Sequence, residues 1–123
     1  MILSIIIPTY NEEHTIIEVL KKIKNDSPNL CKYEVIVIDD GSTDQSRKLL
    51  KNSKHLFDKL LVNETNKGKG FSVKKGILNS SGTHIIFQDA DIEYDPADFK
   101  KFVKIFLDFN ADGIIGSRFI YSN

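Results

Sequence analysis

The sequence predicts an α/β fold in which a mostly parallel sheet is covered by helices on both faces, giving a three-layer α/β/α arrangement. Short apolar runs rich in β-branched residues alternate along the chain with longer amphipathic stretches. Such runs are typical of strands buried on both faces of a parallel sheet. With 123 residues, 41% of them hydrophobic, the chain is long enough for one domain with a core and too short for two.

Five strands are expected, at residues 2–7, 33–39, 58–63, 84–88 and 113–117. Between the first two lies a helix with an apolar face made by Ile16, Val19, Leu20 and Ile23. Before the last lies a helix with a stripe of Phe99, Phe102, Val103, Phe106 and Phe109. Ser42 and Gln45 have the spacing of a capping box, and Asp95 with Pro96 predicts the start of the phenylalanine-rich helix.

Charge and cysteine content exclude several classes of protein. Seventeen basic and seventeen acidic residues cancel without forming long blocks, so no general attraction to nucleic acid or to an anionic membrane is expected. Cys31 is the only cysteine, which excludes an internal disulfide and fits a reducing compartment. The apolar N-terminal MILSIII is too short to span a bilayer, so we interpret it as a buried strand of a cytosolic protein.

Polar and charged residues follow every predicted strand. In a parallel sheet, ligands bind outside the carboxyl ends of the strands. Helix capping needs only one Asp or Ser at each place, so the surplus of polar residues predicts a binding site. The segments are PTYNEE (8–13), DDGSTD (39–44), NETNKGKG (63–70), DADIE (89–93) and SRF (117–119).

Two of these segments have an ordinary structural interpretation beside the functional one. Asp39 and Asp40 could form a turn with a helix cap, or accept hydrogen bonds from a base or a ribose. NKGKG could be a solvated loop, or its glycines could allow close backbone approach to a phosphate while Lys67 and Lys69 supply positive charge. It is not a dinucleotide fingerprint, because Val73 stands at the third glycine position.

The acidic segment after the fourth predicted strand raises the question of a counter-charge. If the extended backbone continues, Asp89, Asp91 and Glu93 lie on one side, where like charges repel. A solvated acidic turn is one interpretation. Hard oxygen ligands beside a phosphate site also suit Mg²⁺ or Mn²⁺. Taken together, the segments at successive strand ends favour a site for a nucleotide diphosphate.

In this order, the segments IIIPTYNEE, VIVIDDGSTD, NKGKG, QDADIEYDP and GSRF resemble those of the inverting family-2 glycosyltransferases. That family has the GT-A fold, with a Rossmann-like nucleotide-binding part. The resemblance covers nearly the whole chain and is strongest to the dolichyl- and polyprenyl-phosphate hexosyltransferases. It implies that residues 1–123 form the N-terminal, nucleotide-sugar-binding part of such a domain, without the acceptor-binding half. Apolar surface intended for that half would favour self-association.

The resemblance also implies roles for individual residues. The base and ribose pocket would be lined by Pro8, Tyr10, Glu12 and Asp40, with Asp39 beside them. The nucleotide would be flanked by Lys67, Gly68 and Ala90. A cofactor Mg²⁺ or Mn²⁺ would be held by Asp89, Asp91 and Glu93. Catalysis would depend on Asp89, Asp91 and Arg118, the last of which would face an acceptor phosphate.

The implied reaction is transfer of a hexose, with inversion, from GDP- or UDP-hexose to a lipid phosphate or a glycan. A lipid acceptor would place the protein at the cytoplasmic face of a membrane. A receiver-type signalling domain also has an acidic Mg²⁺ pocket, but its acidic pair follows the first strand, where this chain has PTYNEE. A non-catalytic module that binds sugar nucleotides is the second alternative.

Overall fold

The computed structural model describes residues 2–26, 31–90, 113–115 and 119–122. Its centre is a six-stranded sheet in the order β3-β2-β1-β4-β6-β5. The first four strands along the chain are parallel neighbours, whereas β6 runs antiparallel to both β4 and β5. The strands are β1 (Ile2–Thr9), β2 (Lys32–Asp40), β3 (Lys59–Asn63), β4 (His84–Phe87), β5 (Gly113–Ile115) and β6 (Phe119–Ser122).

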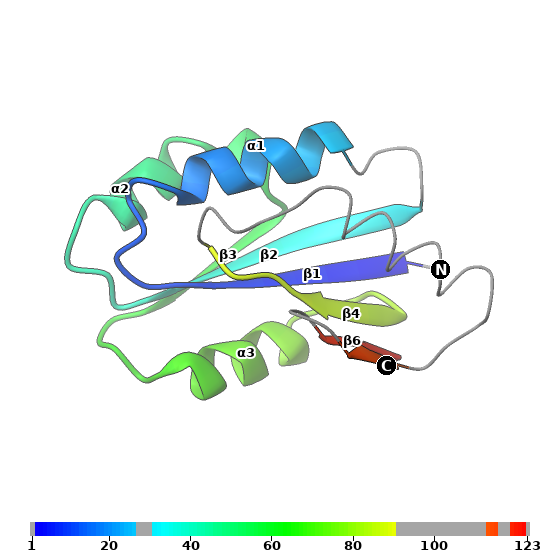
Figure 1. Cartoon of the computed structure of the whole chain (residues 1–123). Coiled ribbons are helices and arrows are strands. Elements are labelled where there is room, and N and C mark those ends of the chain that lie inside the picture. The colour runs from blue at the N-terminus through cyan, green and yellow to red at the C-terminus, as the bar shows by residue number, and fades with distance from the viewer. Residues whose placement is uncertain (1, 27–30, 91–112, 116–118, 123) are drawn as a thin grey trace.

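Helices cover both faces of this sheet, which confirms the predicted three layers (Figure 1). One layer holds α1 (Ile16–Asp26), α2 (Ser46–Lys51) and the short 3-10 helix η1 (Lys54–Leu56), and the other holds α3 (Lys69–Leu78). No helix in the described ranges is long and apolar enough to cross a membrane. The phenylalanine-rich helix and its start at Asp95 and Pro96 lie outside the described residues.

Strand β6 is absent from the sequence prediction. Only residues 116–118 separate it from β5, and the two strands pair antiparallel. A connection this short suits an antiparallel pair, whereas the prediction assumed helical crossovers between all strands. The fifth predicted strand is therefore half of an antiparallel pair at one side of the sheet.

The predicted capping box at Ser42 and Gln45 is wrong. Helix α2 begins at Ser46, and Gln45 makes no side-chain capping bond. The hydroxyl of Ser42 accepts a hydrogen bond from the backbone N–H of Asn11 instead. Asp44 takes over at the helix start, because its Oδ1 accepts the N–H of Ser46 at 2.8 Å.

Side chains of the two central strands alternate between two apolar clusters. Leu3, Ile5 and Ile7 of β1 pack with α1 and α2, whereas Ile6 packs on the opposite face with three buried isoleucines, Ile36, Ile38 and Ile85. Gly76 lets α3 approach this second face closely, since a Cβ there would lie 2.7 Å from Ile6 and 2.8 Å from Ile38. The core thus holds the strands, and their carboxyl ends emerge together at one edge (left in Figure 1).

Candidate functional site

A cleft of about 630 Å³ lies at the carboxyl ends of the four parallel strands. It combines apolar, aromatic, acidic and basic side chains with a glycine backbone. The lining residues are Pro8, Thr9, Tyr10, Glu12, Asp40, Asn66, Gly68, Lys69, Asp89 and Ala90. Residues far apart in sequence meet here because the carboxyl ends of parallel strands lie at the same edge of the sheet.

Asp40 connects the end of β2 to the glycine-containing loop before α3. It is 4% exposed. Its Oδ1 accepts the backbone N–H of Lys67 at 2.8 Å, and its Oδ2 accepts that of Gly68 at 3.0 Å. Burial alone would raise the pKa of Asp40, but these amides and the side chains of Asn63 and Ser72 together hold the pKa below its ordinary value. The carboxylate therefore stays charged and fixes the loop.

A buried polar network extends this anchor into α3. Asn63, 4% exposed, donates from Nδ2 to Asp40 Oδ1 at 2.9 Å and to Ser72 Oγ at 3.0 Å. Its Oδ1 accepts from Lys75 Nζ at 3.0 Å, and the same ammonium group donates to the carbonyl of Val62. Each partner satisfies a group that would be costly to bury alone, so the network stiffens one wall of the cleft.

The turn after Asp40 depends on glycine. Gly41 has a φ of +70°, and a Cβ there would overlap the backbone of Thr65 and Asn66. Asn66 in turn donates from Nδ2 to the carbonyl of Asp40 at 3.2 Å. Because Gly41 has no side chain, the backbones of DDGSTD and NETNKGKG can lie directly against each other at the cleft.

Asn11 joins the loop after β1 to the loop after β2. It has a φ of +50°, a left-handed conformation that is uncommon for a residue other than glycine. Its Oδ1 accepts the N–H of Thr43 at 2.8 Å and that of Asp44 at 3.2 Å, while its own N–H donates to Ser42 Oγ at 3.0 Å. These bonds hold the conformation, and they place the neighbouring Tyr10 and Glu12 at the cleft.

The same two loops are joined again one residue further on. The N–H of Glu12 donates to Ser46 Oγ at 2.9 Å, and the N–H of Glu13 donates to Asp44 Oδ2 at 3.2 Å. In return, Glu13 Oε2 accepts the N–H of Gln45 at 3.0 Å. Side chains of residues 11–13 and of residues 42–46 thus accept hydrogen bonds from each other's backbone N–H groups. Neither sequence segment reveals these contacts by itself.

Asp39 does not line the cleft. Adjacent residues of a strand face opposite sides of the sheet, so Asp39 points toward α2 and is 0% exposed. Its Oδ2 accepts from Arg47 Nε at 2.8 Å, and Arg47 Nη2 donates to the carbonyl of Asn63 at 3.1 Å. Contact with Asp39 raises the pKa of the Arg47 guanidinium. Asp39 is therefore paired with Arg47 inside the protein, away from the cleft.

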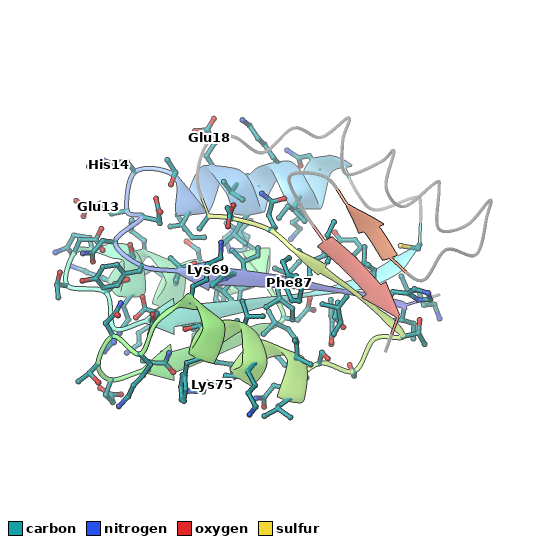
Figure 2. The ribbon with its side chains drawn as sticks, turned by 60° about the horizontal axis from the view of Figure 1, so that its bottom comes forward. Glu13, His14, Glu18, Lys69, Lys75 and Phe87 are labelled. Atoms are coloured by element: carbon teal, nitrogen blue, oxygen red, sulfur yellow. The ribbon has the colours of Figure 1, made fainter. Side chains whose placement is uncertain are left out.

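An ion pair joins two sides of the cleft. Lys69, at the start of α3, extends toward the segment after β4 (Figure 2), where its Nζ lies 2.6 Å from Asp89 Oδ1. Both side chains are more than half exposed, at 65% and 53%. Strand β4 ends at Phe87, so Asp89 is already beyond the strand.

Asp89 suits a divalent cation by its chemistry, since it offers hard carboxylate oxygens, and a bound cation would take the place of the Lys69 ammonium group that lies 2.6 Å from its Oδ1. Within the described ranges no three acidic, histidine or cysteine side chains form a metal-binding group. The other two predicted ligands, Asp91 and Glu93, lie outside the described residues, as does Arg118. A metal site with three carboxylate ligands would therefore need Asp89 together with Asp91 and Glu93.

Most of the predicted site residues that the structure describes meet in the cleft. These are Pro8, Tyr10, Glu12, Asp40, Gly68, Asp89 and Ala90. Lys67 contributes its backbone N–H to Asp40 but is not part of the lining. Two lining residues, Thr9 and Asn66, are absent from the predicted site, although both lie inside the segments that the sequence singles out. Lys69, which was expected to supply positive charge for a phosphate, also lines the cleft.

Known proteins resemble this chain over nearly its full length. A dolichol-phosphate mannosyltransferase of Pyrococcus furiosus is 31% identical over 98% of the chain, and a dolichyl-phosphate β-glucosyltransferase of Drosophila melanogaster is 36% identical over 94% of it. The chain spans 34% and 40% of these two relatives, and 50% of an uncharacterized protein of Methanocaldococcus jannaschii that is 33% identical.

Solved structures show the same fold. TarS 1–349 of S. aureus in complex with UDP superposes with a TM-score of 0.79 at 27% identity, over 92% of this chain and 34% of TarS 1–349. The mannosyltransferase PcManGT of Pyrobaculum calidifontis, in complex with GDP-Man and Mn²⁺, gives a TM-score of 0.74 at 26% identity, over 90% of this chain and 34% of PcManGT. Residues 4–123 also match the model of glycosyl transferase family 2. The resemblance inferred from the sequence is confirmed, and the chain belongs to glycosyl transferase family 2.

Proposed function

We propose that this domain binds a nucleotide-diphosphate sugar in the cleft and takes part in transfer of the sugar, with inversion, to a polyprenyl or dolichyl phosphate. The main support is the convergence of four strand ends in one cleft that has two kinds of lining. Tyr10, Glu12 and Asp40 offer an aromatic face and hydrogen-bond acceptors. Gly68, Lys69 and Asp89 offer open backbone and charge.

The first kind of lining suits the nucleoside. Tyr10 is 44% exposed, and its ring can stack on a base. Glu12 and Asp40 can accept hydrogen bonds from base N–H groups or ribose hydroxyls. The solved relative TarS 1–349 contains UDP and PcManGT contains GDP-Man, so both bases are candidates for this chain.

The second kind of lining suits a diphosphate that arrives with a cation. Three carboxylates and one ammonium group face the cleft, so a bare diphosphate would be repelled. We infer that Asp89, with Asp91 and Glu93, holds Mg²⁺ or Mn²⁺. When bound, such a cation supplies a Lewis acid that stabilises the charge of the departing nucleoside diphosphate. PcManGT was solved with Mn²⁺.

The names of the relatives suggest the acceptor, because both the P. furiosus and the D. melanogaster proteins are named for dolichyl phosphate. A phosphate oxygen is already ionised at neutral pH, so the attacking group needs no general base from the protein. Arg118 is our candidate for holding that phosphate through its planar guanidinium. Binding of the nucleotide sugar without turnover is the second candidate function.

Calorimetry tests the donor proposal. We expect UDP or GDP to bind in Mn²⁺ or Mg²⁺ and to lose binding in chelator or in the Asp91→Ala variant. Glu18→Ala is a control, because Glu18 lies on the outer face of α1 with a 61% exposed side chain. Equal affinity with and without chelator would contradict the metal proposal.

A transfer assay on polyprenyl phosphate, run beside the binding assay, separates a glycosyltransferase from a binding module. Arg118→Lys keeps the charge and loses the two-pronged geometry, so we expect transfer to fall far more than donor affinity. Equal losses in both would instead mean that Arg118 supports the donor site.

A further inference from the structure

Thr15 lies in the turn that leads into α1, next to two parts of the cleft that come from distant segments. Its Oγ1 lies 2.6 Å from the backbone carbonyl of Ala90 and 3.1 Å from Glu12 Oε2. Ala90 is 75 positions away in sequence and follows Asp89 directly. One hydroxyl therefore contacts the carboxylate on the nucleoside side of the cleft and the backbone on its acidic side.

The hydroxyl has one proton and two acceptors within reach. The shorter distance assigns the proton to the Ala90 carbonyl, with Glu12 as the competing acceptor. Ala90 is 4% exposed and packs in the apolar cluster beneath α1, which fixes the distance of this backbone from the helix. The hydroxyl adds direction, because it fixes where the carbonyl after Asp89 points.

We propose that Thr15 is a positioning residue that couples the nucleoside side of the cleft to the cation side at Asp89. Glu12 and Ala90 both line the cleft, and Thr15 is the described side chain that contacts both. A nucleotide that engages Glu12 removes the competing acceptor, so the Thr15 proton stays with the Ala90 carbonyl and orders the backbone beside Asp89. This inference rests on the proposed function, since it concerns how nucleotide and cation affect each other's binding.

The test is a coupling measurement by calorimetry with UDP and GDP as probes. The coupling factor is the ratio of the nucleotide dissociation constants without and with saturating Mn²⁺. Thr15→Val keeps the shape and removes the hydroxyl, so we expect the factor to fall about fivefold to tenfold, the loss of roughly one hydrogen bond. Thr15→Ser keeps the hydroxyl and is expected to retain the wild-type factor.

Thr83→Val is the matched control. Thr83 Oγ1 accepts from Ile2 N at 3.0 Å and lies 3.2 Å from the Ile2 carbonyl, at the opposite end of the sheet. The same chemical change is made there without contact to the cleft, so the coupling factor should not change. If Thr15→Val does not fold, Thr15→Cys replaces it, because Cys matches Ser in shape and is a much weaker donor.

The outcomes separate this inference from the proposed function. A wild-type protein that binds no nucleotide, or binds it independently of Mn²⁺, overturns both. A wild-type coupling factor that persists in Thr15→Val or Thr15→Cys overturns only the role of Thr15. Equal losses in Thr15→Ser and Thr15→Val would also overturn it, because a variant that keeps the hydroxyl would then behave like one that lacks it. Loss in Val or Cys with retention in Ser supports the inference.

Discussion

Strand β2 carries an anchored carboxylate near each end, and the two have similar partners but different surroundings. At the amino end, Glu34 Oε1 accepts from Ser4 Oγ and from the N–H of Ser81, and Oε2 accepts from Ser81 Oγ, all within 2.6–2.7 Å. At the carboxyl end, Asp40 accepts the two loop amides of Lys67 and Gly68. Each carboxylate thus ties a loop flanking α3 to the sheet.

The two carboxylates also share their electrostatics. Burial alone would raise the pKa of Glu34, but the Ser81 amide, the hydroxyls of Ser4 and Ser81, and Lys59 together lower it. The pKa of Asp40 is lowered in the same way. Only Asp40 faces the cleft at the strand ends. A hydrogen-bonded carboxylate with a lowered pKa therefore does not by itself mark a functional site, and its position at the strand ends is the informative part.

A third carboxylate, Asp39, sharpens this comparison because it lies at the same end of β2 on the opposite face. Arg47→Met leaves Asp39 buried and without its cation, so we expect the free energy of unfolding to fall by about 3 kcal/mol. Urea unfolding measures the loss. Lys22→Met, which breaks the exposed pair with Glu18, should change stability by less than about 1 kcal/mol. Similar small losses in both would contradict the structural role of Asp39.

The paired variants Asp40→Asn and Glu34→Gln test whether position decides function. Both place an amide donor against backbone N–H groups, so both should lower stability by about 1–3 kcal/mol. Only Asp40→Asn is expected to weaken nucleotide binding as well, by about 1–3 kcal/mol. Calorimetry on the folded variants decides the matter. An unchanged affinity in Asp40→Asn would make Asp40 equivalent to Glu34, a structural anchor only.

The loop before α3 can also be displaced by a substitution that leaves the Asp40 carboxylate unchanged. Gly68 has φ +96° and ψ 158°, a region that glycine alone occupies readily. Gly68→Ala should cost about 1–2 kcal/mol of stability and shift the amides away from Asp40. Gly70→Ala is the control, because Gly70 lies within α3 with open space around it and alanine favours a helix by up to about 1 kcal/mol. Thermal unfolding of the two variants should shift in opposite directions.

The smallest expected effect is on pH dependence. Both carboxylates have lowered pKa values in the folded protein, so their stabilisation is present above the unfolded pKa, about 3.9 for Asp and 4.3 for Glu. It is lost as the pH falls through the folded pKa. At acid pH, the slope of the free energy of unfolding against pH is proportional to the number of protons taken up on unfolding. Asp40→Asn and Glu34→Gln should each lower that number by at most about one. A slope as steep as that of the wild type would contradict the assignment.

The fold and the location of the cleft were predictable because they depend on local patterns. Short apolar runs predict the parallel strands. The carboxyl ends of parallel strands lie at one edge of the sheet, which brings Tyr10, Asp40 and Asp89 together. Strand alternation would also have separated Asp39 from Asp40, although the two were interpreted together.

Contacts that depend on tertiary structure were not predictable in this way. The left-handed Asn11, the bond from Thr15 to Ala90 and the partners of Ser42 all join segments at least 31 positions apart. No local period or motif records such contacts. Strand β6 was missed because a short antiparallel return carries a weaker signal than helix-connected strands.

The ion pair between Lys69 and Asp89 has a consequence for ionic strength. Because both side chains are largely exposed, the pair is worth at most about 1 kcal/mol and is screened at physiological salt, where the Debye length is about 8 Å. Asp40, by contrast, lies in buried hydrogen-bonded surroundings that salt barely reaches. Added salt therefore weakens the Lys69–Asp89 pair and leaves the buried Asp40 unchanged. A charged ligand that separates Lys69 from Asp89 meets a cost close to thermal energy.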